Sequence, residues 1–246
     1  MRAFAFLFAL CAATALPAQA QEPQGLDAAA LTPIYAAEIF QQDVIAMSKP
    51  VLAGAEGDGE APAAADPAAR QALTYTPSPE VEGRTRQKLY DSIAATVSDP
   101  TLQQQIAQSV STDTIWRQFH GVLSRAGFST TNLADVATAY YVIAWEVVNG
   151  PQATANAAAV QAVHADVAAA LTSDPRLADL TDAEKQEAAS VMAYMATVAA
   201  ASANELRSAG NTRALEQLQQ QVHKAVLGQG LDLAQLQLTP EGFAAR

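Results

Sequence analysis

The stretch Leu133–Val148, with the sequence LADVATAYYVIAWEVV, is the most hydrophobic part of this 246-residue chain after its first twenty residues. Its polar interruptions are Asp135, Thr138 and Glu146. A helix that is apolar on nearly every side is usually buried in a protein core. A run of this length with two carboxylates is not a membrane span, which takes about 20 apolar residues. The stretch therefore predicts a central helix that other helices surround.

Helix signals recur on both sides of this stretch. Asn132 is a suitable N-cap, with Asp135 in the first turn, and Gly150-Pro151 ends the helix. Thr181-Asp182-Ala183-Glu184 is a capping box that begins a long helix. With apolar residues at three- and four-residue spacing, these signals predict an all-α fold, a single multi-helix bundle around the hydrophobic central helix. The other predicted helices cover residues 81–97, 101–110, 112–126, 153–171, 181–208 and 212–227, and a short apolar tail covers 231–238.

The first twenty residues have the layout of a secretory signal peptide. Arg2 gives a positive start, an apolar run follows, and Ala18-Gln19-Ala20 is a small-x-small cleavage sequence. We therefore expect residues 1–20 to be a signal peptide that is cleaved after Ala20. The protein is then expected in the periplasm or outside the cell, with no membrane span in its mature form.

The next sixty residues, 21–80, are expected to form a flexible N-terminal arm. Residues 31–47 have apolar side chains at helical spacing and predict one helix in this arm. Residues 48–80 are rich in Pro, Ala and Gly and contain few large apolar side chains, which predicts a linker. The all-helical domain is then expected over residues 81–246.

Composition excludes several classes of function. The one cysteine, Cys11, lies in the expected signal peptide, so the mature chain would be cysteine-free, without thiol catalysis, a thiolate metal ligand or a disulfide. The chain is alanine-rich and acidic, with a net charge of -11. Nucleic acids and anionic lipid surfaces are bound by clustered Lys and Arg. An acidic chain of this kind is a poor candidate for either ligand.

Several short motifs give the chain a resemblance to a known family. They are Tyr75-Thr76-Pro77-Ser78-Pro79, Asn132-Leu133-Ala134-Asp135, Tyr140-Tyr141, Trp145-Glu146, Gly228 to Leu233, and Gly242-Phe243. In these motifs the chain resembles an uncharacterised family of secreted bacterial helical proteins. The resemblance implies a helical fold and secretion, and it implies no activity.

Glu146 is a weak candidate for a catalytic acid or base, because it lies beside Trp145 in an apolar setting. Asp135 and Glu146 fall on nearly the same face of one helix, about 16 Å apart along its axis. Paired glycosidase carboxylates lie about 5–9.5 Å apart, so these two residues are no such pair. The favoured interpretation of Glu146 is structural, as the partner of an arginine on another helix, with Arg117 and Arg125 as candidates.

No cofactor or metal site is predicted. The three histidines, His120, His164 and His223, fall on three different predicted helices, which leaves open only a zinc site assembled across helices. The chain has no HExxH or GxSxG sequence, no phosphate loop and no dinucleotide fingerprint.

A binding groove is a further hypothesis. Trp116 and His120 lie one turn apart on one face of a predicted helix. With Tyr141 and Trp145 of the central helix, they are the candidate groove residues. The alternative, which such sets more often represent, is packing between helices.

The sequence is compatible with three functions. The favoured one is a secreted or periplasmic, non-enzymatic helical domain that binds a protein partner or a small apolar ligand, because no catalytic constellation is present. The second is a hydrolase-type enzyme acting on cell-envelope material, with Glu146 as acid or base. The third is a self-assembling structural protein, in which the apolar face of the predicted helix 212–227 pairs with another chain. The oligomeric state is not predicted.

Overall fold

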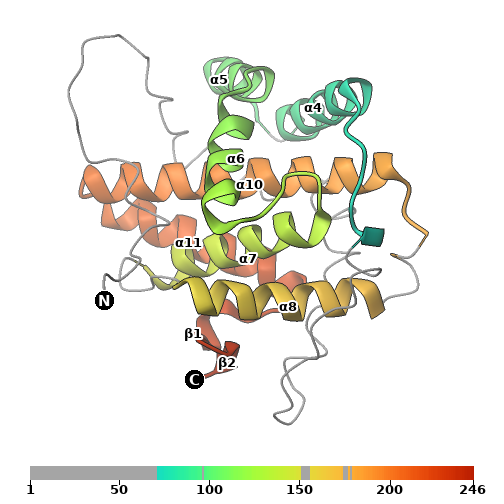
Figure 1. Cartoon of the computed structure of the whole chain (residues 1–246). Coiled ribbons are helices and arrows are strands. Elements are labelled where there is room, and N and C mark those ends of the chain that lie inside the picture. Colours follow the sequence, from blue (N-terminus) through green and yellow to red (C-terminus); the bar gives the residue numbers. More distant parts are fainter. Residues whose placement is uncertain (1–70, 96, 151–155, 174–176, 178) are drawn as a thin grey trace, which may run out of the picture.

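The computed structural model describes residues 71–95, 97–150, 156–173, 177 and 179–246. The expected signal peptide, the helix predicted over 31–47 and most of the predicted linker lie outside the described residues. The described chain is mostly helical (Figure 1), which confirms the predicted fold class. Its elements are α4 (Pro79–Ala94), α5 (Pro100–Ser111), α6 (Thr114–Ala126), α7 (Leu133–Asn149), α8 (Ala157–Ser173), α10 (Asp182–Ser208), α11 (Thr212–Gly228), the 3-10 helix η2 (Leu233–Gln235), β1 (Leu236–Thr239) and β2 (Gly242–Ala245).

The predicted central helix, α7, lies at the centre of the bundle. Fourteen of its 17 residues, including Tyr140 and Glu146, are buried. α7 packs against α10, α8 and α11 and also contacts α6 and η2 (Figure 1). The Asn132 side chain accepts hydrogen bonds from the backbone N–H groups of Ala134 and Asp135, as its predicted role as N-cap requires.

The long helix α10 is the second organising element. Thr181 and Glu184 form the predicted capping box at its start. The helix spans the bundle (Figure 1), and α4, α6, α7 and α11 all pack against it. Alanines such as Ala189 and Ala193 occupy much of its buried face. Because alanine has a small side chain, neighbouring backbones approach α10 closely.

The folded body begins earlier than the boundary expected at residue 81. Leu73 and Tyr75 belong to the hydrophobic core. The backbone N–H of Tyr75 donates to the carbonyl of Thr131 (2.9 Å), and that of Leu133 donates to the carbonyl of Leu73 (2.9 Å). The last residues of the predicted linker therefore lie against the start of α7. Two buried apolar side chains and two backbone hydrogen bonds hold this short segment on the body.

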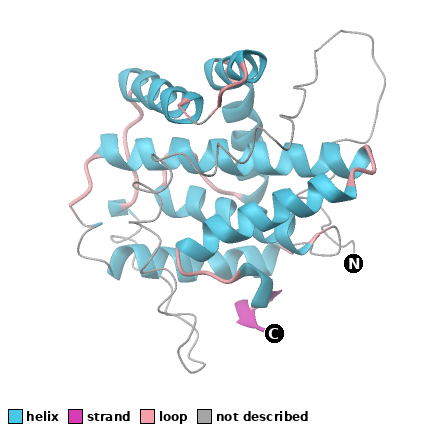
Figure 2. Cartoon of the chain, turned by 180° about the vertical axis from the view of Figure 1, so that it is seen from behind, coloured by secondary structure: helices cyan, strands magenta, loops and turns pink. Residues whose placement is uncertain are grey.

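The C-terminal tail forms a small β-hairpin that the sequence analysis did not predict. β1 and β2 pair antiparallel, with Leu238 opposite Phe243. The hairpin lies at the edge of the helical bundle (Figure 2) and packs on α8. Trp145 of α7 donates from Nε1 to the Leu236 carbonyl (3.1 Å), which ties the hairpin to the central helix. No helix among the described residues is long and apolar enough to cross a membrane.

Candidate functional site

A cavity of about 580 Å³ lies between α4 and α6. Both helices pack on α10, which supplies one side of the floor, while Val136 of α7 supplies another part. Tyr75, Pro77 and the loop residues Thr130 and Thr131 also line it. The volume falls in the range of about 300–1,000 Å³ that is typical of small-molecule sites.

The floor of the cavity is apolar. Phe119 and Val136 are buried there, beside Ala189 and Ala193 of α10. The two alanines leave space that a larger side chain would fill, so that α4 and α6 both pack on α10 with an open hollow between them. A floor of this kind favours the hydrocarbon part of a ligand, since burying apolar surface is favourable by about 25 cal/mol per Å².

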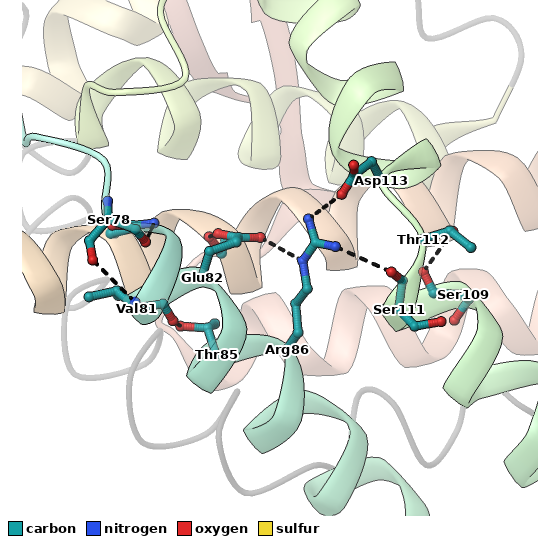
Figure 3. Close-up of polar contacts among 11 residues, drawn as sticks. Ser78, Val81, Glu82, Thr85, Arg86, Ser109, Ser111, Thr112 and Asp113 are labelled. Carbon is teal, nitrogen blue, oxygen red and sulfur yellow. Dashed lines mark hydrogen bonds and ion pairs between the residues drawn. The ribbon is translucent and has the colours of Figure 1, made fainter.

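Arg86 of α4 connects the helices that form the walls (Figure 3). Its Nε donates to Glu82 Oε1 (3.0 Å), its Nη2 to Asp113 Oδ1 (2.8 Å), and its Nη1 to the Ser111 carbonyl (3.4 Å). The guanidinium also lies over the Trp116 ring, 4.1 Å from the ring centroid, in cation–π geometry. Arg86 therefore joins α4 to the C-terminus of α5 and to the start of α6.

The positive charge of Arg86 is offset by the two carboxylates to which it is hydrogen-bonded. Burial lowers the pKa of Arg86, but its bonds to Asp113 and Glu82 outweigh burial and raise the pKa overall. The hydrogen bond from Arg86 and its positive charge lower the pKa of Asp113. Glu82 also accepts from Ser190 Oγ of α10 (2.8 Å). Both oxygens of the Glu82 carboxylate are thus occupied, so the group is held in a structural role.

Tyr75 closes the opposite end of the cavity. Its hydroxyl donates to the Thr130 carbonyl (2.5 Å). Burial and, to a lesser degree, the nearby charge of Glu82 raise the pKa of Tyr75 far above its usual range. The phenol therefore stays protonated and acts as a hydrogen-bond donor that fastens the 128–132 loop. Beside it, Gln186 of α10 bonds both the N–H (2.8 Å) and the carbonyl (3.0 Å) of Ser78.

Two exposed side chains of α6, Arg117 and His120, lie at the mouth of the cavity. The Arg117 Nη2 donates to Thr114 Oγ1 at 3.4 Å, a long hydrogen bond within one helical turn. The His120 Nε2 lies 3.3 Å from Ser124 Oγ. The charge of Arg117 also contributes, after the contacts with Arg86, to lowering the pKa of Asp113.

The four predicted groove residues do not come together. Trp116 and His120 both line the cavity, with the Trp116 ring 6.0 Å from that of Tyr194. Tyr141 is buried in the core, where its ring packs 5.2 Å from Tyr140. Trp145 packs 6.3 Å from Phe243 of the hairpin. Tyr141 and Trp145 thus pack in the core and against the hairpin, and of the four predicted residues Trp116 and His120 line the cavity.

Glu146 is buried, 5 % exposed, and is not among the residues that line the cavity. The arginine that interacts with it is Arg207 of α10, where burial lowers the pKa of the guanidinium and the charge of Glu146 opposes this change. The expected partners were wrong: Arg117 lies at the cavity mouth and Arg125 ends α6. Helical periodicity shows which face a residue occupies, but it does not show which distant helix packs against that face.

Asp135 contacts both the loop before α7 and the helix α8. Its carboxylate lies 2.7 Å from His164 Nε2 and accepts from the Ser129 N–H (2.7 Å). It therefore fixes the loop before α7 and connects that loop to α8. Within the residues that the structure describes, no group of three or more His, Cys, Asp or Glu is arranged to hold a metal ion.

Sequence reasoning missed three residues that shape the cavity, namely Tyr75, Glu82 and Arg86. Tyr75 was assigned to the linker, although it stands as a large aromatic residue in a proline-rich segment. The signal for the other two was their spacing: Glu82 and Arg86 are four residues apart, which places them on one helix face.

Comparisons with known proteins give a family but no activity. A protein-family model described as "Family of unknown function (DUF6683)" matches residues 1–246. No curated protein and no solved structure matches the chain significantly. The chemistry of the cavity therefore has to be read from its own residues.

Proposed function

The chain belongs to this family of unknown function, and we propose that it is an exported, non-enzymatic helical domain that binds a small, largely apolar ligand between α4 and α6. The observation that carries the proposal is the cavity of about 580 Å³ over a buried apolar floor. Export rests on the signal-peptide pattern of residues 1–20.

The polar groups of the cavity support binding over catalysis. Glu82 and Arg86 are held by each other and by Ser190 and Asp113. A general acid or base needs access to the reacting group, whereas these side chains hold the walls in place. The concave shape also favours a small molecule over a protein partner, because stable protein interfaces bury about 800 Å² on each side.

The test uses the full chain and the neutral fluorophore N-phenyl-1-naphthylamine, which brightens in apolar surroundings. We expect saturable binding of one molecule per chain. Ala193→Leu and Ala189→Leu each fill the floor and should weaken binding at least tenfold. Ala201→Leu, on the same helix but away from the cavity lining, is the matched control and should bind normally.

Circular dichroism and thermal melting show whether each variant remains folded. Two independent filling variants are used because each alanine is buried and one leucine could disturb packing. Equal binding by the filled variants and the wild type would contradict the proposal, as would the absence of saturable binding.

A further inference from the structure

A ligand bound as in the proposed function, on which this inference rests, also presents a chemical group at the cavity mouth. We propose that the ligand is an apolar carboxylic acid, with its hydrocarbon body over Phe119 and Ala193 and its carboxylate at Arg117. The inference depends on which charged groups of the cavity are already occupied and which are available.

The inner charges are occupied. Arg86 uses three nitrogens in bonds to Glu82, Asp113 and the Ser111 carbonyl, and its flat face lies on Trp116. Glu82 is held by Arg86 and Ser190. Three of the five N–H donors of Arg86 are already used, and two carboxylates already offset its charge, so Arg86 is the less available of the two guanidiniums in the lining.

The outer cation is available. Arg117 is exposed at the mouth, and its hydrogen bond to Thr114 uses one of its nitrogens. His120 lies three residues further along α6, hence on the same face, and also lines the cavity. A guanidinium presents a planar set of donors that matches a carboxylate with two parallel hydrogen bonds.

The local charge permits an anion here even though the chain carries a net charge of -11. The lining contains two carboxylates, Glu82 and Asp113, and two guanidiniums, Arg86 and Arg117. Their formal charges cancel, and the Asp113 carboxylate is hydrogen-bonded to Arg86 and interacts more weakly with the charge of Arg117. An incoming carboxylate therefore meets no excess of negative charge from the lining, and it meets the guanidinium of Arg117 at the entrance.

The floor of the cavity determines the chemistry of the part of the ligand that lies below the mouth. Phe119, Val136 and Ala193 are each less than 5 % exposed and offer no hydrogen-bonding side chain. A sugar or another polyhydroxylated ligand would lose its bonds to water against such a floor, at a cost for each unsatisfied group. An acid with a hydrocarbon body loses none, because its single polar group stays at the mouth.

The experiment measures displacement of N-phenyl-1-naphthylamine from the full chain by three probes with the same twelve-carbon body. They are dodecanoate, 1-dodecanol and dodecyltrimethylammonium, each used below its critical micelle concentration. We expect dodecanoate to bind about tenfold more tightly than the alcohol, since one charge-assisted contact is worth about that factor. Arg117→Ala should remove this advantage and leave the affinity for dodecanol unchanged. Arg125→Ala, an exposed arginine of the same helix that does not line the cavity, is the matched control and should change neither affinity.

Equal affinities for the three probes would overturn the inference, and so would a preference for the cation or an unchanged dodecanoate affinity in Arg117→Ala. In each of these cases saturable binding of the fluorophore would leave the proposed function standing. Failure of the fluorophore to bind would overturn both. Arg117 and Arg125 are exposed, so their replacement is expected to leave the fold intact, and circular dichroism checks this point.

Discussion

Replacing Arg86 with methionine tests whether this side chain holds the cavity walls together. Methionine keeps much of the aliphatic stem and removes the guanidinium. The side chains of Arg86 and Glu82 are 21 % and 24 % exposed. Loss of the cation–π contact with Trp116 costs about 1 kcal/mol, and leaving the partly buried Glu82 without its cation costs about 1 kcal/mol more. The exposed contact with Asp113 adds little, because solvent screens it.

The expected result is a loss of about 2 kcal/mol in the free energy of unfolding, the sum of these two contributions. The measurement is denaturant unfolding followed by far-UV circular dichroism. The matched control is Arg84→Met on the same helix, where Arg84 pairs with Glu80 and the two side chains are 52 % and 82 % exposed. That exposed pair should contribute less than about 0.5 kcal/mol. Equal losses in the two variants would refute the reasoning.

Two further predictions concern the hairpin and the start of α10. Gly242 has a φ of +115°, and a Cβ atom there would lie 2.8 Å from Asp166 Oδ2, so Gly242→Ala should lower the melting temperature. Adding Asp166→Ala should relieve the clash but not the backbone strain, and a double-variant loss as large as the sum of the single losses would contradict this explanation. At α10, hydrogen bonds from the Thr181 hydroxyl and backbone lower the pKa of Glu184. A lowered carboxyl pKa stabilises the fold above the usual pKa of the group, and this stabilisation is lost as pH falls through the folded-state pKa. Glu184→Gln keeps a capping side chain that does not titrate, so its melting temperature should fall less between pH 6 and pH 3 than that of the wild type. Identical pH profiles would rule this out.

Local signals explain which parts of the fold were predictable. Asn132, Gly150 and the Thr181 capping box act on the backbone within a few residues, so the chain alone shows them. The hairpin was missed because each strand has four residues, too few for a clear alternation of apolar and polar side chains.

The candidate site was less predictable because its residues meet only through tertiary packing. Arg86 and Trp116 are 30 positions apart, and they come into contact because α4 and α6 both pack on α10. The same reason explains the wrong partners proposed for Glu146. Trp116 and His120 were found because they share a single helix face, which is a property of local sequence.

The bridge between Thr74 and Asn132 joins residue 74 to the N-cap of α7. That point lies one residue from Tyr75, which closes one end of the cavity. A group attached at residue 71, four residues before Tyr75, is therefore held near the site, and a short tether gives an effective concentration in the millimolar range. A peptide tag placed there would compete with free ligand, whereas a fluorophore attached at the same position would report on occupancy of the cavity.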